Sequence, residues 1–248
     1  IMKVLGLFDG ISCGMAALER AGIPVERYAA YEIDKYAIKI SEKNYPFIEN
    51  CGNVFDGDFT QYKGFDLLIG GSPCTYWSIA KRNRETTCEG EGFKFFMQYV
   101  RALKESGCRY FLYENNYSIH KDIKAEISRQ LGVEPIIINS ALVSAQSRKR
   151  CYWTNIPNVT QPDDKGILLK DIIESAVRSR YKDKGNRSKK AGGGTFYYII
   201  RKLSPIECER LQTLPDNYTE GVSNTQRYKQ LGNGWTVDVI AHILSFIK

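Results

Sequence analysis

The chain has 248 residues, and its 35 Lys and Arg against 28 Asp and Glu give a formal net charge of +7. Hydrophobic residues make up 43% and charged residues 25%, which is an ordinary globular composition. These values exclude a disordered tail, a collagen-like repeat and a small disulfide scaffold. The length suits one α/β domain with at most a small appendage.

Segments with strand character alternate with segments of helical spacing along most of the chain. In chain order, strands are predicted at 3–8, 28–31, 66–69, 110–113, 135–138 and 150–153, and helices at 14–21, 35–44, 92–105 and 121–131. Residues 203–248 are predicted to contain further helix and strand. This alternation predicts an α/β fold with a doubly wound, mostly parallel sheet, whose ligands bind beyond the C-terminal ends of the strands.

Residues 163–198 interrupt this pattern because they are polar, basic and contain several glycines. Within them, residues 178–190 hold seven basic residues and one acid, a local net charge of +6. Such a run is either a solvated loop or an element that contacts phosphates. We interpret this part of the chain as a small insert in the sheet domain.

Three further classes of protein or site are disfavoured. No segment approaches the roughly 20 consecutive apolar residues of a membrane helix. The chain opens on a strand-like segment rather than a secretory signal, so we expect a cytoplasmic protein. The seven cysteines lack Cys-x-x-Cys spacing, and there are only two histidines, so neither a disulfide framework nor a metal site is predicted.

Two early loops have the features of a nucleoside site. The first strand leads into Phe8-Asp9-Gly10-Ile11-Ser12-Cys13-Gly14, where backbone amides at a helix start can approach a ligand. Glu32 ends the second strand about 20 residues later, at the position where an acidic side chain holds ribose hydroxyls. The first loop alone could be a plain turn, but the two features together favour a cofactor that carries a nucleoside.

Candidate reactive groups follow at two later strand ends and at the beginning of another strand. Cys74 comes after Gly70-Gly71-Ser72-Pro73, where a helix N-terminus and nearby cations would lower the pKa of a thiol; the alternative is a buried structural cysteine. Glu114 could act as a general acid or merely cap a helix. Arg148 and Arg150 would point to the same side of a strand, unless they belong to a solvated basic cluster.

Together and in this order, these motifs resemble the DNA (cytosine-5) methyltransferases. The resemblance covers nearly the whole chain, and its closest match is the catalytic domain of the mammalian de novo enzymes and their compact phage-encoded relatives. The motifs that carry it are Phe8-Asp9-Gly10-Ile11-x-x-Gly14, Glu32, Gly71-Ser72-Pro73-Cys74, Glu114-Asn115, Gln146-x-Arg148-x-Arg150, Arg210-Leu211-Gln212 and Gln230-Leu231-Gly232-Asn233.

The resemblance implies a Rossmann-like, S-adenosylmethionine-dependent enzyme that methylates carbon 5 of a flipped-out cytosine in double-stranded DNA. Cys74 would attack carbon 6 and form a covalent intermediate, while Glu114 would protonate or hydrogen-bond N3. Arg150 would bind O2 of the base and orient Glu114, with Arg148 in support. Asn115 would position the loop that carries Cys74.

The resemblance also implies sets of binding residues and a division of the chain. The implied cofactor set is Phe8, Asp9, Gly10, Ile11, Ser12, Gly14, Glu32, Ile33, Asn53, Val54, Ser72, Pro73, Asn233, Gly234 and Trp235. The implied DNA-binding set is Ser78, Arg82, Arg84, Arg178, Arg180, Lys182, Lys184 and Arg187. Residues 1–155 would form the catalytic and cofactor-binding domain, residues 156–200 a small target-recognition region, and residues 201–248 a return to the catalytic domain.

The chain departs from the family pattern at three places. Thr75 stands where Gln usually follows the catalytic cysteine, and Asn116 stands where Val usually completes Glu-Asn-Val. The adenine-reading Gly-Asp-Val corresponds either to Gly52-Asn53-Val54 or to Gly57-Asp58-Phe59, and the spacing to Cys74 favours the former. None of these changes removes the nucleophile, the acid or the arginine.

Several alternatives stay open at this point. The same scaffold could methylate RNA, or it could be a catalytically silent protein that binds DNA or a partner. An adenosyl-nucleotide oxidoreductase is disfavoured because Gly-x-Gly-x-x-Gly is missing. The sequence does not decide between a monomer and a homodimer that extends the DNA surface, nor between restriction-modification, viral counter-defence and gene control, and it does not specify the target site.

Overall fold

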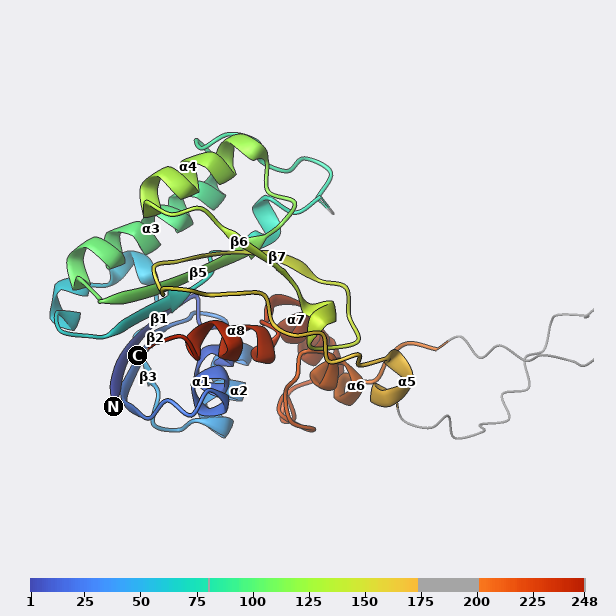
Figure 1. Ribbon diagram of the computed structural model, residues 1–248. Coiled ribbons are helices and arrows are strands. Elements are labelled where there is room, and N and C mark those ends of the chain that lie inside the picture. Colours follow the sequence, from blue (N-terminus) through green and yellow to red (C-terminus); the bar gives the residue numbers. More distant parts are fainter. Residues whose placement is uncertain (80, 174–200, 248) are drawn as a thin grey trace, which may run out of the picture.

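The structure is a computed structural model that describes residues 1–79, 81–173 and 201–247. Within them, seven strands form one sheet in the order β3-β2-β1-β4-β5-β7-β6 (Figure 1). The strands are β1 (Met2–Leu7), β2 (Val25–Tyr31), β3 (Glu49–Asn50), β4 (Leu67–Gly70), β5 (Tyr110–Asn116), β6 (Ile136–Asn139) and β7 (Lys149–Thr154). Neighbouring strands from β3 to β5 are parallel, whereas β7 runs antiparallel to both β5 and β6. The predicted doubly wound, mostly parallel sheet is confirmed.

Helices cover both faces of this sheet. Figure 1 shows α3 and α4 on one face and α1, α2 and α8 on the other. The helices are α1 (Cys13–Arg20), α2 (Lys35–Asn44), α3 (Glu91–Ser106), α4 (Lys121–Leu131), α5 (Leu169–Ile172), α6 (Pro205–Leu211), α7 (Asn224–Asn233) and α8 (Val237–Leu244). The strands thus have two buried faces, which explains why they read as nearly continuous apolar runs.

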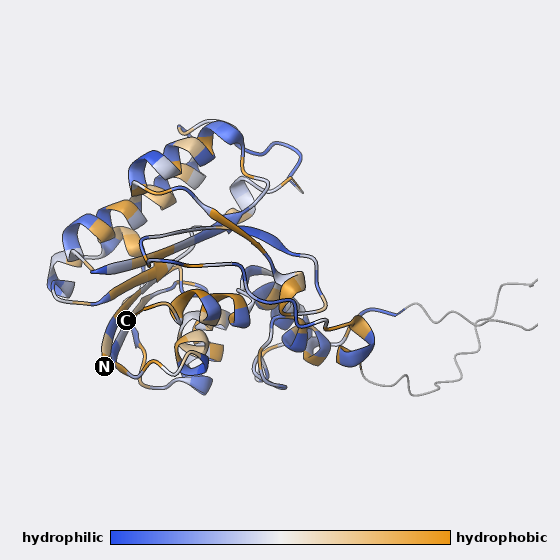
Figure 2. Cartoon of the chain, in the orientation of Figure 1, coloured by the Kyte–Doolittle hydropathy of each residue, from blue (hydrophilic) through white to orange (hydrophobic). Residues whose placement is uncertain are grey.

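Each face of the sheet has its own core. Phe96 of α3 and Ile127 of α4 are fully buried in one cluster. Leu18 of α1, Ile40 of α2 and Ile240 of α8 are fully buried in the other. Hydrophobic and hydrophilic residues alternate along α3 and α4 in Figure 2, as expected for helices with one buried side. This arrangement leaves the ends of the strands free for a site.

The ends of the best-predicted helices are encoded locally. Helix α2 has the predicted bounds because the Asp34 side chain accepts a hydrogen bond from the backbone nitrogen of Tyr36, a typical N-cap. Helix α4 also has the predicted bounds, since Gly132 follows it with a φ of 72°, a left-handed conformation that glycine adopts without strain.

Two predictions about elements are wrong. Residues 201–247 were expected to include a strand, but in this part of the structure they form only α6, α7 and α8. The apolar run of α8 is buried almost all round, and periodicity alone does not separate such a helix from a buried strand. Strand β5 was expected to end at Tyr113, but pairing with β7 extends it to Asn116.

Part of the predicted target-recognition region at 156–200 lies against the sheet domain. The side-chain amide of Gln161 donates to the carbonyl of Ile137, and the backbone nitrogen of Lys165 donates to the carbonyl of Leu142. The basic run at 178–190 and the three glycines after it lie outside the described residues. The domain division at residue 156 therefore stays a prediction. No helix within the described residues is long and apolar enough to cross a lipid bilayer.

Candidate functional site

A cavity of about 250 Å³ opens at the C-terminal ends of β1, β2, β4 and β5. It joins most of the residues that the sequence predicted for a cofactor to the predicted nucleophile and acid. The predicted residues that line it are Phe8, Asp9, Gly10, Glu32, Ile33, Asn53, Val54, Ser72, Pro73, Cys74, Glu114, Asn233, Gly234 and Trp235. The fold thus brings into one cavity predicted site residues that lie more than 200 positions apart in the sequence.

Three predicted cofactor residues lie behind the cavity wall instead. Ile11 and Ser12 are buried, and the Ser12 hydroxyl donates to the Asp9 carboxylate at 2.5 Å. At Gly14, a Cβ atom would come within 2.8 Å of the Tyr28 hydroxyl, so that only glycine fits without a shift. These residues shape the loop rather than face the cavity.

Glu32 is held in place by backbone amides. Its Oε2 accepts from the Gly10 nitrogen at 2.8 Å, and its Oε1 accepts from the nitrogens of Ile33 and Asp34 at 2.8 and 2.7 Å. Gly10 makes this contact with a φ of 60°, a conformation that favours glycine. The carboxylate is therefore preorganised at the edge of the cavity and keeps lone pairs for a ligand.

Asp9 is a half-buried acid that lines the cavity. Its Oδ1 accepts from the Tyr28 hydroxyl at 2.6 Å, while Ser12 donates to Oδ2. Burial raises the pKa of Asp9 to about 6, although both hydroxyl donors act in the opposite direction; the nearby charge of Glu32 adds to the rise. The carboxyl group therefore titrates well above the usual range for aspartate.

The two candidate adenine-reading segments differ in position. Gly52, Asn53 and Val54 line the cavity, and the Asn53 side chain caps the short turn after it by accepting from the Phe55 nitrogen at 3.1 Å. Asp58 is instead engaged by Thr60, whose backbone nitrogen and hydroxyl both donate to it. The geometry favours the segment with Asn53.

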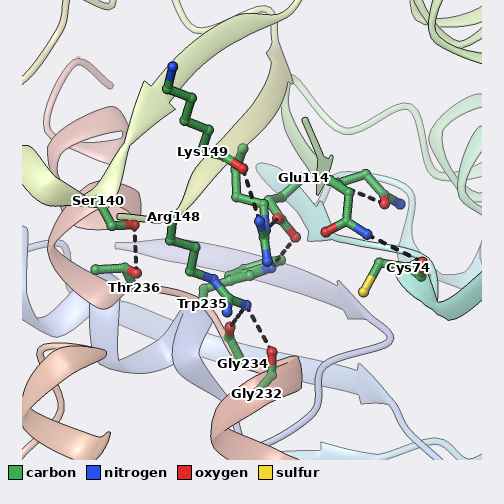
Figure 3. A network of polar contacts seen from close by, with 12 residues as sticks. Cys74, Glu114, Ser140, Arg148, Lys149, Gly232, Gly234, Trp235 and Thr236 are labelled. Carbon is green, nitrogen blue, oxygen red and sulfur yellow. Dashed lines mark hydrogen bonds and ion pairs between the residues drawn. The ribbon is translucent and has the colours of Figure 1, made fainter. Parts of the chain in front are cut away.

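The Glu114 carboxylate stands at the centre of the reactive side of the cavity (Figure 3). Its Oε1 pairs with Arg150 Nε at 3.0 Å, and its Oε2 accepts from Trp235 Nε1 at 2.8 Å. Only 9% of Glu114 is exposed. The alternative that Glu114 caps a helix is wrong, because His120 is the N-cap of α4.

Antiparallel pairing explains how β5 presents this group. Side chains alternate between the two faces of a strand, so Glu114 and Asn116 share one face, and Tyr113 and Asn115 the other. Asn116 pairs with Arg150 across β5 and β7, which places both on the side of Glu114. On the other side, Asn115 Nδ2 donates to the carbonyl of Ser72 at 3.1 Å and thereby holds the loop before Cys74.

Arg148 has a different task from Arg150. Its guanidinium donates to the carbonyls of Gly232 and Gly234, both at 2.9 Å (Figure 3). It therefore fixes the turn that presents Trp235 to Glu114. Burial lowers the pKa of Arg148, and the charge of Arg150 lowers it further, so the two guanidinium groups act on each other.

The pKa of the Cys74 thiol differs from the expectation. The sequence predicted that a helix N-terminus and cations would lower its pKa, but its pKa is raised. Burial is the largest cause, and the Glu114 carboxylate adds to it, whereas Arg150 and Arg148 act in the opposite direction. Cys74 begins only a three-residue 3₁₀ turn, too short to contribute an appreciable helix dipole.

The predicted DNA-binding residues are only partly placed. Arg82 is exposed, Ser78 is half-buried, and Arg84 donates to the carbonyl of Ser118 at 2.7 Å, which ties the Cys74 loop to the end of β5. Arg178, Arg180, Lys182, Lys184 and Arg187 lie outside the described residues. In the parts of the chain that the structure describes, no three His, Cys, Asp or Glu side chains gather as a metal site would require.

Sequence reasoning missed Phe95 and Tyr31, which also line the cavity. Phe95 contacts Phe8 edge-on, with ring centroids 6.0 Å apart. Phe95 precedes the buried Phe96 on α3 and does not belong to the apolar face of this helix, so the helical pattern did not identify it. An aromatic residue beside the core face, opposite an aromatic loop residue, was the signal that could have found it.

Comparisons with known proteins identify the family to which this chain is similar. The profile of a family described as C-5 cytosine-specific DNA methylase matches residues 2–163 and 146–248. The orphan methyltransferase M.Rho11sI of Bacillus phage rho11s is 33% identical over 187 residues, 68% of this chain but 36% of the relative. The type II methyltransferase M.NlaX of Neisseria lactamica is 27% identical and covers 100% of this chain and 96% of its own. The chain thus matches well under half of the phage relative's length.

Solved structures share the fold at low identity. The methyltransferase EhMeth of Entamoeba histolytica superposes with a TM-score of 0.75 at 16% identity, covering 99% of this chain and 97% of its own. The Dnmt2 methyltransferase of S. pombe gives a TM-score of 0.72 at 17% identity, with 99% and 98% covered. At this identity, the likeness concerns the fold alone.

Proposed function

The chain belongs to the C-5 cytosine-specific DNA methylase family, and on this premise we propose that it transfers a methyl group from S-adenosylmethionine to carbon 5 of cytosine in double-stranded DNA. One observation carries the proposal. Cys74, Glu114 and Trp235 line the same cavity as the residues predicted to bind the cofactor, and Trp235 donates a hydrogen bond to Glu114. The cytosine has to leave the base stack to reach Cys74, at a cost of a few kcal/mol that contacts in the pocket offset.

The residues of the site fit a reaction through a covalent adduct. The Cys74 thiolate forms a bond to carbon 6 while the acid form of Glu114 gives a proton to N3, so that carbon 5 becomes an electron-rich enamine carbon. S-adenosylmethionine, when bound, supplies a methyl group on a sulfonium that accepts the electron pair of carbon 5, and leaves as S-adenosylhomocysteine. Loss of the carbon 5 proton to water and departure of Cys74 then restore the ring, and N3 returns its proton to Glu114.

Arg150 contributes in two ways to this scheme. Its ion pair with Glu114 holds the carboxyl group in the cavity wall, and its remaining N–H groups are available to the O2 atom of the base. It also lowers the pKa of Cys74, which favours the attacking thiolate. Asn115 positions the Cys74 loop from the opposite face of β5.

The chemistry of the residues that line the cavity suits S-adenosylmethionine. The fixed carboxylate of Glu32 can accept the ribose hydroxyls, and Phe8 and Asn53 can contact the adenine. Gly10 and the acid of Asp9, which both line the cavity, can face the methionine part, which carries positive charges. Asn233, Gly234 and Trp235 would close the cavity from the C-terminal side.

The first experiment is methyl transfer from labelled S-adenosylmethionine to mixed-sequence duplex DNA, with single-stranded DNA and tRNA in parallel. We expect label on carbon 5 of duplex cytosines, lost with Cys74→Ala and retained with Cys88→Ala, which removes another half-buried thiol. Label in RNA alone would overturn the substrate and keep the chemistry. Cofactor binding without label on any nucleic acid would instead indicate a silent scaffold.

The basic run outside the described residues is proposed as a contact to DNA phosphates, with neighbouring residues that read bases. Replacing Lys182, Lys184 and Arg187 by Ala removes three charges, so the slope of log affinity against log salt should fall by up to about 3. Filter binding to duplex DNA over a range of salt concentrations measures this slope. An unchanged slope would contradict the proposed contact.

A further inference from the structure

Asn116 is a buried polar residue beside the nucleophile, and the scheme above gives it no role. It ends β5, and only 7% of it is exposed. Its Nδ2 donates to the backbone carbonyl of Cys74 at 3.3 Å. It stands where the family pattern has Val, a side chain that can donate no hydrogen bond.

The position of Asn116 follows from the strand pair that builds the site. Asn116 shares a face of β5 with Glu114 and pairs directly with Arg150 of β7. Asn116 is the last residue of β5, so its carboxamide lies at the C-terminal end of the strand. It is neutral, whereas Glu114 and Arg150 beside it form an ion pair. The carboxamide contacts the carbonyl of Cys74, whereas the ion pair of Glu114 is made with Arg150.

The carboxamide of Asn116, which holds the Cys74 carbonyl, also acts on the thiol of that residue. Four groups act on this thiol: Glu114 of β5 raises its pKa, whereas Arg150 of β7, Arg148 just before β7 and the hydrogen bond from Asn116 lower it. Burial is the largest cause and raises the pKa. Asn116 is therefore a neutral group that favours the thiolate in a setting that on balance disfavours it.

We propose that Asn116 is a positioning residue for the nucleophile: its carboxamide fixes the Cys74 carbonyl and turns an N–H group toward the sulfur, which supports the thiolate before attack. The inference rests on the proposed role of Cys74. The proposed hydrogen-bond donor is the side chain of Asn116, the residue at which the Glu-Asn-Val motif of the family is changed in this chain.

The test measures Cys74 itself in the free protein, without DNA or cofactor. Alkylation by iodoacetamide is followed from about pH 6 to about pH 10, a range that spans the ordinary thiol pKa of about 8.5. Peptide mass spectrometry separates Cys74 from the other six cysteines, which serve as internal controls. Because no methyl transfer is needed, failure of this inference is distinguishable from failure of the proposed activity.

We compare the full-length wild type with Asn116→Val and Asn116→Asp. Asn116→Val should move the midpoint of Cys74 alkylation to higher pH and reduce its rate near pH 7 by about tenfold, the loss of thiolate for a rise of one pH unit. Asn116→Asp has nearly the same shape but adds a negative charge, so it should move the midpoint further. In methyl transfer, both variants should lower kcat and leave the KM for the cofactor unchanged.

Asn155→Val is the matched control. Asn155 also bridges backbone groups with its carboxamide, donating to the Arg109 carbonyl and accepting from the Phe111 nitrogen, but it does so at the far end of β5. It should reduce thermal stability without moving the Cys74 midpoint. The inference fails if Asn116→Val leaves the midpoint unchanged, or if Asn155→Val moves it by as much.

Discussion

The two sides of the cavity are built by different means. On the cofactor side, the parallel strands β1 and β2 end in loops whose backbone amides fix the carboxylate of Glu32. On the reactive side, the antiparallel pair β5 and β7 carries side chains that contact one another directly, as Glu114 contacts Arg150. Backbone amides thus fix the carboxylate of Glu32, whereas side chains fix the carboxylate of Glu114.

This difference assigns separate effects to the two sides. Groups fixed by backbone present a constant surface to a ligand, so changes there should alter affinity. Groups that hold each other by charge and hydrogen bonds set protonation and orientation, so changes there should alter the chemical step. The predictions that follow use substitutions close in shape to test this separation.

The largest effect is expected at the acid on the reactive side. Glu114→Gln keeps the shape and still accepts from Trp235, but it removes the ion pair with Arg150 and the transferable proton. We expect kcat for methyl transfer to fall by about 10² to 10⁴, the usual contribution of a general acid. Steady-state kinetics measures kcat, and calorimetric titration of the cofactor should give an unchanged Kd. A weakened cofactor affinity would show that the two sides are not separate.

The next largest effect is expected at Asp9, the half-buried acid of the cofactor side, and concerns the stability of the fold. The pKa of Asp9 is about 6 in the folded protein and near 3.8 without burial. Below about pH 4 the group is protonated in both states, and between the two values the folded state holds the extra proton. Stability should therefore fall as pH rises from about 4 to about 6, by about 3 kcal/mol for this group.

Asp9→Asn should abolish that part of the pH dependence. Urea unfolding at intervals between about pH 4 and pH 7 measures it, with Asp56→Asn, an exposed acid, as the matched control. Equal slopes for wild type and Asp9→Asn would contradict the assignment. If the slope is confirmed, the protein keeps a destabilising charge in the cavity, where a positively charged cofactor could offset its cost.

A smaller effect is expected at Glu32. Glu32→Gln keeps the side-chain length and one oxygen, but it removes the charge that accepts from Gly10 and that we propose accepts from a ribose hydroxyl. We expect the Kd for S-adenosylmethionine to rise by about tenfold, because hydrogen bonds to charged groups contribute about 1.5 kcal/mol or more. The kcat at saturating cofactor should be nearly unchanged. A large loss of kcat at saturation would instead assign Glu32 to the chemical step.

Much of this site could be predicted from the sequence, because its groups follow apolar strands directly. Glu32, Cys74 and Glu114 each lie at or near the end of a strand that its apolar run identifies, and parallel strands bring such ends together. Asn53 could be separated from Asp58 by spacing alone. Features of this kind can be predicted because they depend on residues that are neighbours in the chain.

The rest depends on contacts between distant segments. The length of β5 is set by β7, about 40 residues later, and the pKa of Cys74 by burial and by Glu114 rather than by its own turn. The helical form of 237–244 follows from packing in the core beside α1, which an apolar run does not reveal. Arg150 was predicted to orient Glu114 with Arg148 in support, but only the fold shows that Arg148 does so by holding the turn of Trp235.

The smallest effect is expected where the two sides of the cavity meet. Trp235 lines the cavity and donates to Glu114, and Arg148 fixes its turn through the Gly234 carbonyl. Trp235→Phe keeps an aromatic wall and removes the donor, a loss of about 1 kcal/mol, so kcat should fall about fivefold. Because the smaller ring also fills less of the cavity, the Kd for the cofactor should rise about twofold to threefold. Steady-state kinetics measures kcat, and calorimetric titration measures Kd. Trp235 is thus expected to alter both quantities at once, unlike Glu114 and Glu32, and a change in only one would assign it to a single side.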